Sequence, residues 1–247
     1  MSLLKVGDVR VAEGDRAGAL AAYEEGLAIA RALAARDPGN ADWARDVSVS
    51  LNRVGDVRVA EGDRAGALAA YEEGLAIARD LAARDPGNAG WARDVSVSLE
   101  RVGDVRVAEG DRAGALAAYE EGLAIRRALA ARDPGNAGWA RDVSVSLNKV
   151  GDVRVAAGDR AGALAAYQED LAIARDLAKR DPGNAGWARD VVVSLAKMAQ
   201  ADEARAAEYW AQAVDRLEAM EARGIIAPVD AWILPMAREE LAKARAR

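Results

Sequence analysis

The chain has 247 residues, a net charge of −6 and a pI near 5.0, and it contains neither cysteine nor histidine. Without cysteine there are no disulfides or thiolate metal sites, and without histidine the usual zinc ligand and general base are missing. The acidic balance is the wrong sign for a general nucleic-acid binder, which must neutralise phosphates. The sequence shows no signal peptide and no transmembrane run, so together with the lack of cysteine we expect a cytoplasmic protein.

One segment dominates the sequence because it is repeated four times. It begins at Val6 and returns almost unchanged at Val54, Val102 and Val150, a spacing of 48 residues. A fixed period of this size predicts a stack of similar units, each of which buries the apolar face of its neighbour. The first copy begins half-way through its first helix, whereas the others are complete.

The first helix of a unit, helix A, is predicted from about Ala41 to Ala60. It follows Asp37–Asn40, in which proline stops the previous helix and Asn40 caps the next one. The alternation in this segment also resembles a strand, but an apolar stripe with helical spacing spans all of it. The stripe consists of Trp43, Val47, Leu51 and Val54.

The second helix, helix B, is predicted from about Arg64 to Arg84. Gly62 ends helix A, and Asp63 caps helix B. The predicted buried face of helix B consists of Ala67, Leu68, Tyr71, Leu75 and Leu81. The glycines of the unit lack the following Lys-Ser/Thr of a phosphate-binding loop, so we interpret Gly55 and Gly74 as sites of close helix packing.

These residues resemble the tetratricopeptide repeat, a family of helix–turn–helix units of about 34 residues. The resemblance covers roughly residues 1 to 200 and rests on Leu51, Val54, Gly55, Gly62, Asp63, Ala67, Tyr71 and Leu75 at matching spacings. Two insertions of about seven residues, close to two helical turns, extend the unit to 48 residues without turning its buried faces. Arg58 departs from the family, which often has an aromatic residue there. The resemblance implies an elongated repeat of this type.

We therefore predict an all-α, right-handed solenoid of stacked antiparallel helix pairs with about eleven helices. Residues 1–197 are expected to form four repeats, and residues 198–247 a divergent C-terminal cap. A last helix is expected from about Val229 or Asp230, with Trp232, Ile233 and Met236 folded back on the stack. A membrane-surface helix is the alternative for this end, but only its last few residues are basic.

The resemblance also implies a binding surface, because that family binds ligands along the inner faces of its A helices. The implied positions are an Arg row, a Val row, an Asn/Glu row, an Asp row and a second Val row, each on the same stripe of successive A helices. They are Arg45, Val49, Asn52, Asp56 and Val59, then Arg93, Val97, Glu100, Asp104 and Val107, then Arg141, Val145, Asn148, Asp152 and Val155. These polar residues are alternatively ordinary solvated residues copied with the repeat.

The function that this surface implies is a non-catalytic protein-interaction scaffold that binds a peptide or a partner protein, without a cofactor. Alternatives are a sensor or regulatory segment of a larger signalling protein and a helical-repeat nucleic-acid binder. An enzyme is disfavoured, because carboxylates copied in every repeat do not form one distinctive site. The truncated first helix further predicts an uncapped end, with Leu20 and Tyr23 partly exposed, and weak self-association through residues about 2 to 35.

Overall fold

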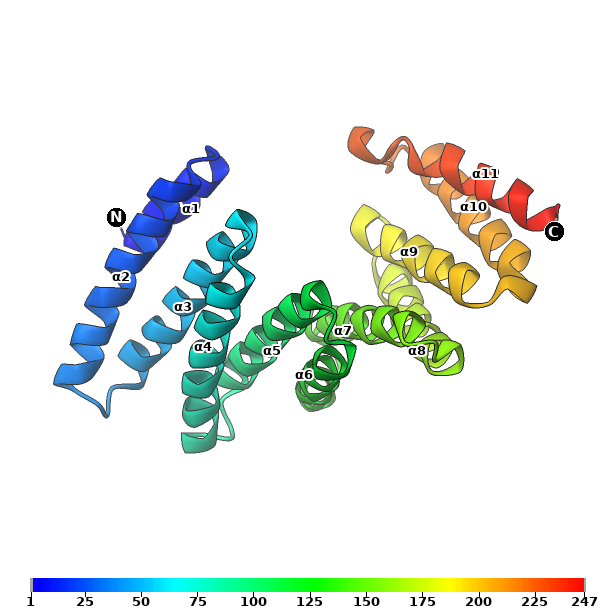
Figure 1. The fold of residues 1–247 in the computed structure, drawn as a ribbon. Coiled ribbons are helices and arrows are strands. Elements are labelled where there is room, and N and C mark those ends of the chain that lie inside the picture. The colour runs from blue at the N-terminus through cyan, green and yellow to red at the C-terminus, as the bar shows by residue number, and fades with distance from the viewer. Residues whose placement is uncertain (1, 247) are drawn as a thin grey trace. The chain divides into compact units, whose positions relative to one another are not determined.

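A computed structural model describes residues 2–246, and within them all regular structure is helical (Figure 1). The predicted all-α fold class is confirmed, and these residues form eleven α-helices. The helices are α1 (Leu3–Ala12), α2 (Arg16–Arg36), α3 (Ala41–Glu61), α4 (Arg64–Arg84), α5 (Ala89–Glu109), α6 (Arg112–Arg132), α7 (Ala137–Ala156), α8 (Arg160–Arg180), α9 (Ala185–Ala201), α10 (Ala206–Ala222) and α11 (Ile233–Arg245). We call α1, α3, α5, α7 and α9 the A helices, and α2, α4, α6 and α8 the B helices.

The elongated repeat is confirmed by the lengths of these helices. Helix α3 ends one residue later than predicted, and α4 has the predicted bounds. Each has 21 residues, which corresponds to about 30 Å of helix. Helix α1 has only 10 residues, because it begins at Leu3, the copy of Leu51, and so lacks nearly three turns that α3 has before that position.

Two types of cap recur along the repeats and fix where α2 to α9 begin. Before each complete A helix, the side chain of an asparagine accepts a hydrogen bond from the backbone N–H of the tryptophan three residues later. Asn88, for example, accepts from the backbone N–H of Trp91 at 3.1 Å. Before α4, Asp63 accepts one from the N–H of Gly66 at 2.9 Å. Gly62 ends α3 with φ +86°, in the left-handed region that favours glycine.

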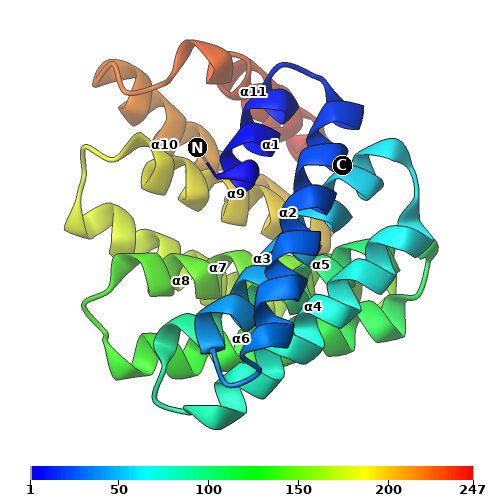
Figure 2. The same cartoon turned by 90° about the vertical axis from the view of Figure 1, so that its left-hand side faces the viewer.

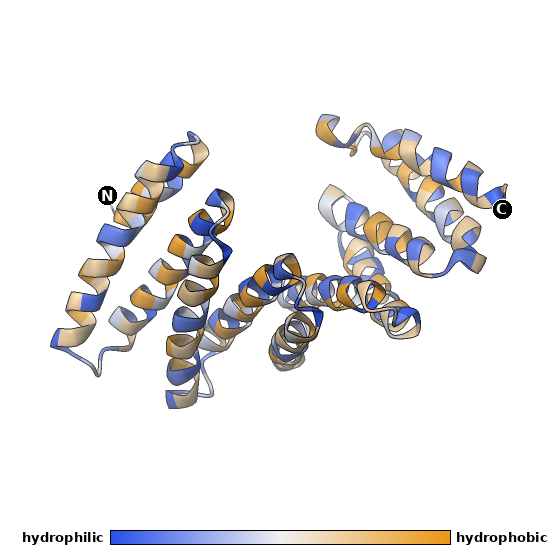
Figure 3. Ribbon diagram, in the orientation of Figure 1, coloured by the Kyte–Doolittle hydropathy of each residue, from blue (hydrophilic) through white to orange (hydrophobic). Residues whose placement is uncertain are grey.

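The chain divides into two compact units, Met1–Ile125 and Arg126–Arg247. In unit 1, each core layer combines the tyrosine and leucines of one B helix with the valines and leucine of the A helix that follows it. Tyr23 and Leu27 of α2, for example, pack with Leu51 and Val54 of α3. Unit 2 has one continuous core that runs from α8 to α11 and includes Trp210 and Leu217. Figure 3 shows the resulting bands of apolar and polar residues along the helices.

Glycines and tyrosines make the closest contacts between A and B helices. The ring of Tyr119 in α6 lies so close to Gly103 in α5 that an added Cβ would be 2.7 Å from its Cδ1 atom. The same overlap occurs between Gly55 and Tyr71 and between Gly151 and Tyr167. The packing interpretation of these glycines is therefore supported, since any side chain would push the helices apart.

The C-terminal helices differ from the prediction in two respects. Helix α11 begins at Ile233 rather than at Val229 or Asp230, because Pro228–Asp230 forms a short 3-10 turn first. Ile233 is buried and Met236 is half-buried against the core of unit 2, as predicted. Trp232 is 59% exposed, so the prediction that it packs on the core is wrong. It stands at the N-cap position of α11, one residue before the face that packs against α10 begins.

The prediction for the N-terminal end is also partly wrong. Tyr23 is only 2% exposed, because its ring lies against Gly7 of α1 and within the core layer that α2 shares with α3. Leu20 is half-buried, like its copy Leu68. The short helix α1 is therefore sufficient to cover the tyrosine.

We predict that Gly103→Ala destabilises the protein by about 1–2 kcal/mol. Overpacking against Tyr119 costs about 1–3 kcal/mol, and alanine in a helix returns up to about 1 kcal/mol. Chemical denaturation would measure the loss. Gly90→Ala is the matched control in the same helix, because Asp42 occupies the equivalent position of α3 and shows that a side chain fits there. Equal effects of the two changes would contradict the proposed contact.

We also predict that Trp91→Ala costs about 2 kcal/mol, below the 3–5 kcal/mol expected for a fully buried tryptophan, because Trp91 is half-buried. The same denaturation experiment measures it. A loss near zero would mean that the indole ring contributes nothing to packing at the start of α5.

Candidate partner-binding surface

The two valine rows of the predicted surface lie at different depths. Val49, Val97 and Val145, near the middle of the A helices, are half-buried. Val59, Val107 and Val155, near their C-terminal ends, are 45%, 46% and 37% exposed. The second row is thus an accessible apolar surface, and Val11 of α1, at 50% exposure, occupies the equivalent position.

The Asp row joins helices within a repeat and between repeats. The hydroxyl of Tyr71 donates to Asp56 at 2.8 Å. Arg101 of the next A helix binds the same carboxylate with Nε at 2.8 Å and Nη2 at 3.2 Å. In unit 2, Tyr167 and Lys197 hold Asp152 in the same way, at 2.7 Å and 2.6 Å. Asp104 accepts a hydrogen bond from Tyr119 at 2.5 Å.

The tyrosine donors of this row are firmly protonated. Burial, reinforced by the hydrogen bond to the Asp8 carboxylate, raises the pKa of Tyr23 to about 12. Burial and Asp56 raise the pKa of Tyr71 in the same direction. Each hydroxyl therefore remains a donor at neutral pH.

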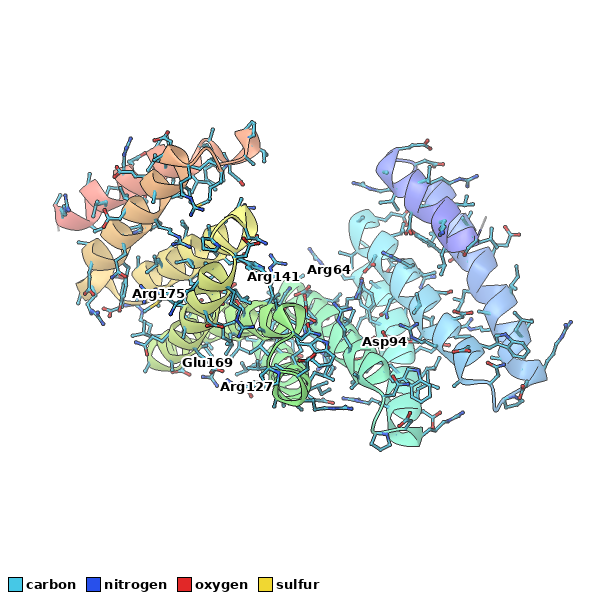
Figure 4. All side chains as sticks on the ribbon, turned by 180° about the vertical axis from the view of Figure 1, so that it is seen from behind. Arg64, Asp94, Arg127, Arg141, Glu169 and Arg175 are labelled. Carbon is cyan, nitrogen blue, oxygen red and sulfur yellow. The ribbon has the colours of Figure 1, made fainter. Side chains whose placement is uncertain are left out.

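The Arg row also pairs with the next A helix. Arg45 binds Asp94 with Nε at 2.5 Å and Nη2 at 3.2 Å, and this hydrogen bond raises the pKa of Arg45. Arg141 binds Asp190 at 3.0 Å in unit 2. Figure 4 labels one member of each pair, Asp94 of the first and Arg141 of the second. Arg93, at the equivalent position of α5, is exposed and also has an interaction partner. Arg45 and Arg141 already have carboxylate partners and are not free to hold a ligand carboxylate without breaking an ion pair.

The residues of the predicted Asn/Glu row are buried or half-buried. Asn52 is 8% exposed, and its Nδ2 donates to Ser98 of the next A helix at 3.2 Å. Asn148 is half-buried and donates to Asp170 at 2.9 Å. Glu100 is half-buried. Asn52 faces the neighbouring A helix, where the small Ser98 allows a close approach, whereas Asn148 bonds to Asp170 of α8.

Two pockets of unit 1 combine the remaining accessible groups. One, of about 250 Å³, lies between α3 and α5 and is lined by Asp56, Val59, Tyr71, Arg101 and Asp104 among others. The other, of about 430 Å³, lies between α1 and α3. Its lining includes the copies of those groups one repeat earlier, namely Asp8, Val11, Tyr23, Arg53 and Asp56. The structure therefore repeats one type of pocket between successive A helices, with apolar and ion-paired walls.

A third pocket, of about 500 Å³, lies in unit 2 beside the C-terminal helices and was not found by sequence reasoning. Trp210 and Met236 line it together with the polar residues Gln200, Glu240 and Lys243. Gln200 stands where the repeats have the Asp row. The signal available in the sequence was the loss of the repeat pattern after Lys197, which does not indicate a cavity.

Two buried polar residues that occur only once in the repeats were also missed. Asp170 replaces the glycine of the other B helices and is fully buried. It accepts hydrogen bonds from Ser144, from Asn148 and from Ser194 at 2.6 Å, so it ties α7, α8 and α9 together. Arg126, which replaces an alanine, is 6% exposed and donates to Ser146 at 2.6 Å. In sequence each looks like drift, because burial depends on the neighbouring helix.

No group of three or more potential metal ligands occurs among residues 2–246. Within the same residues, none of the helices has the length and apolar character that crossing a membrane requires.

The buried carboxylate predicts a distinctive pH dependence. Burial raises the pKa of Asp170 above its usual 3.8, while its hydrogen bonds act in the opposite direction. When the pKa of a carboxyl group is higher in the folded than in the unfolded protein, the group contributes its full stabilisation at pH values below the unfolded pKa. This contribution is lost as the pH rises through the folded pKa. Asp170→Asn cannot titrate, so its unfolding free energy should gain on that of the wild type as the pH rises above about 4.

Urea denaturation at several pH values would measure this difference, with Asp215→Asn, an exposed change on α10, as the control. A difference between Asp170→Asn and the wild type that does not vary with pH would show that Asp170 is ionised equally in both states.

Comparison with known proteins supports the fold and gives no closer relation. The sequence matches no family model and no curated protein. Among solved structures, a Podosopora anserina protein with nearly identical TPR-like repeats has a TM-score of 0.63 at 16% identity, over 92% of this chain and 96% of that one. BtubC from P. vanneervenii has a TM-score of 0.61 at 18% identity, over 92% and 85%.

The apo form of RapI has a TM-score of 0.55 at 12% identity, over 99% of this chain and 82% of that one. At these identities the likeness concerns the fold alone. The predicted resemblance is thereby confirmed: the chain has the fold of tetratricopeptide-like repeat proteins.

Proposed function

We propose that the chain is a non-catalytic protein-interaction module and that its partner lies along the A helices. The observation that carries the proposal is the row of exposed valines, Val11, Val59 and Val107, beside the repeated pockets of unit 1. These valines are not needed for the core, yet the same apolar group recurs in every repeat. Apolar groups that recur on an exposed helix surface beside pockets favour contact with a partner.

The charges around these valines limit what the partner can be. Asp56 is held by Tyr71 and Arg101, and Arg45 is held by Asp94, so most of the charge is neutralised within the protein. A ligand therefore gains mainly by burying apolar side chains over the valines and in the pockets. An extended peptide or an amphipathic helix with regularly spaced apolar residues fits this surface.

The ion pairs also disfavour the nucleic-acid alternative. Phosphates would have to compete with Asp94 and Asp190 for Arg45 and Arg141. A regulatory segment of a larger signalling protein would use the same surface, and we retain it as a form of the interaction proposal. Self-association through the N-terminal end concerns a different surface and is considered in the next section.

The valine row allows a cleaner test than the Asp row. Charge reversal of Asp56, Asp104 and Asp152 would place lysines next to cations such as Arg101 and weaken the joints between repeats. A loss of binding could then reflect a loss of structure. Changes at the exposed Val59 and Val107 avoid this problem, because neither side chain is in the core.

We predict that Val59→Glu combined with Val107→Glu leaves the unfolding midpoint nearly unchanged and weakens binding by about tenfold or more. An unpaired carboxylate buried under a partner costs more than the roughly 1.4 kcal/mol that corresponds to tenfold. Calorimetry with a peptide or protein selected on the wild-type chain would measure it. Val229→Glu, at a side chain that is 77% exposed, is the control. Unchanged affinity in the double variant would remove this surface from the binding site.

A further inference from the structure

One end of unit 1 exposes a surface that is covered in every later repeat of that unit. We call it the head face, and it comprises Lys5, Val9, Arg10, Glu25 and Ile29 on α1 and α2. Figure 2 looks onto this end, where α1 and α2 lie in front of the other helices of unit 1. The two apolar residues are each 49% exposed.

The copies of these apolar residues show what normally covers them. Val57 and Val105 are each 3% exposed, and Ile77 packs on the core layer that contains Tyr23 and Ala19 of the preceding repeat. Val57 belongs to that same layer. Within residues 2–246, no hairpin lies against Val9 and Ile29 as α1 and α2 lie against the copies of these residues, and this accounts for their exposure.

The charged residues of the head face also have paired copies. Glu73, the copy of Glu25, accepts from Arg31 of the preceding repeat at 2.5 Å, and Glu121 accepts from Arg79 at 2.7 Å. The pair of Arg127 with Glu169 repeats this contact in unit 2 (Figure 4).

The other two charges follow the same rule. Arg58 and Arg106, the copies of Arg10, bind Glu24 and Glu72 of the preceding repeat at 3.3 Å and 3.1 Å. Arg101, a copy of Lys5, binds Asp56. At the boundary between the second and third repeats, two cations of the later repeat, Arg101 and Arg106, meet two carboxylates of the earlier one. One carboxylate of the later repeat, Glu121, meets Arg79 of the earlier one.

Within residues 2–246 the head face lacks such partners. Neither Lys5 nor Glu25 forms an ion pair there, and Arg10 contacts only groups of its own hairpin, the carbonyl of Gly18 at 2.8 Å and Asp15 at 4.0 Å. The surface is therefore a copy of part of an interface that the protein already forms, and its opposite side is absent from residues 2–246.

We propose that the head face docks a helical hairpin of this same repeat type carried by another chain. The hairpin presents an Asp, a Glu and an Arg at the positions of Asp56, Glu72 and Arg79, and these meet Lys5, Arg10 and Glu25. Apolar residues of the hairpin cover Val9 and Ile29. This surface is separate from the valine row of the A helices, so the inference does not depend on the proposed function.

A second copy of this chain is a poorer occupant. Arg175 contacts Gln212 of α10, which places Gln212 at the position of Glu73 and therefore Glu218 at the position of Arg79. The C-terminal cap would bring Glu218 against Glu25. Two head faces placed together would set two cations and one carboxylate against the same set, which leaves positive charge unmatched.

The probe is a synthetic peptide of residues 41–84, the hairpin of α3 and α4, titrated into the full chain at low salt, where exposed ion pairs are least screened. We expect saturable binding with one hairpin per chain. Glu25→Arg should weaken it about tenfold, and the peptide with Arg79→Glu should restore binding to that variant. Glu61→Arg, at an exposed carboxylate elsewhere, is the matched control and should bind like the wild type.

Failure of the charge exchange to restore binding would overturn the proposal, as would equal binding to all variants. Sedimentation of the chain alone tests whether a second copy of this chain occupies the head face instead. A dimer that Glu25→Arg abolishes and that excess hairpin does not dissociate would show that the head face pairs with itself.

A tethered version keeps the test decisive if the free hairpin is too weakly folded to bind. In it, a copy of residues 41–98 is placed directly before Leu3, which also extends α1 by its missing turns. We expect a higher unfolding midpoint and slow hydrogen exchange in the added hairpin. Part of this gain should be lost with Glu25→Arg and recovered with Arg79→Glu in the added copy. An added hairpin that exchanges like an unfolded chain would refute docking.

Discussion

A hairpin of two helices has apolar residues on both of its sides, and only a neighbouring hairpin can cover each side. In this protein the constraint is met by repetition, because Tyr23 and Leu27 of one repeat form a layer with Leu51 and Val54 of the next. The layers are rich in alanine and valine, whose small side chains allow the helices to approach closely. Tyr119 against Gly103 shows the limit of that approach, since no side chain fits between them. Most of the stabilisation must come from these layers.

The charged residues follow from the same constraint. Because every repeat is both an upstream and a downstream neighbour, its two sides must carry complementary charges, and the pairs Arg31–Glu73, Arg45–Asp94 and Arg101–Asp56 recur with the period of the sequence. These side chains are partly exposed, and each such pair is worth about 0–1 kcal/mol. Their main effect is to fix the register of one hairpin on the next. They also explain why the residues most readily taken for ligand contacts in the sequence are already occupied.

Within the repeats the sequence was sufficient for the helices, their bounds to within one residue and their caps, because these depend on local chemistry such as Asn88 before α5 and Gly62 after α3. It was not sufficient for depth within the stack. Asn52 lies on the predicted stripe of its helix, but its burial depends on how closely the neighbouring A helix approaches through Ser98.

Asp170 likewise reads as a chance substitution until Ser144 and Ser194 are placed around it by two other helices. Of the candidate surface, the exposed valines Val59 and Val107 could be predicted from the helical stripe, whereas the pockets beside them depend on the spacing between helices.

Native-state hydrogen exchange tests most directly whether neighbours on both sides stabilise each hairpin. The amides of α2, which is covered on one side only in unit 1, should exchange faster than those of α4, whose sequence differs from that of α2 at one residue. Equal protection of these two helices would contradict this account of the fold.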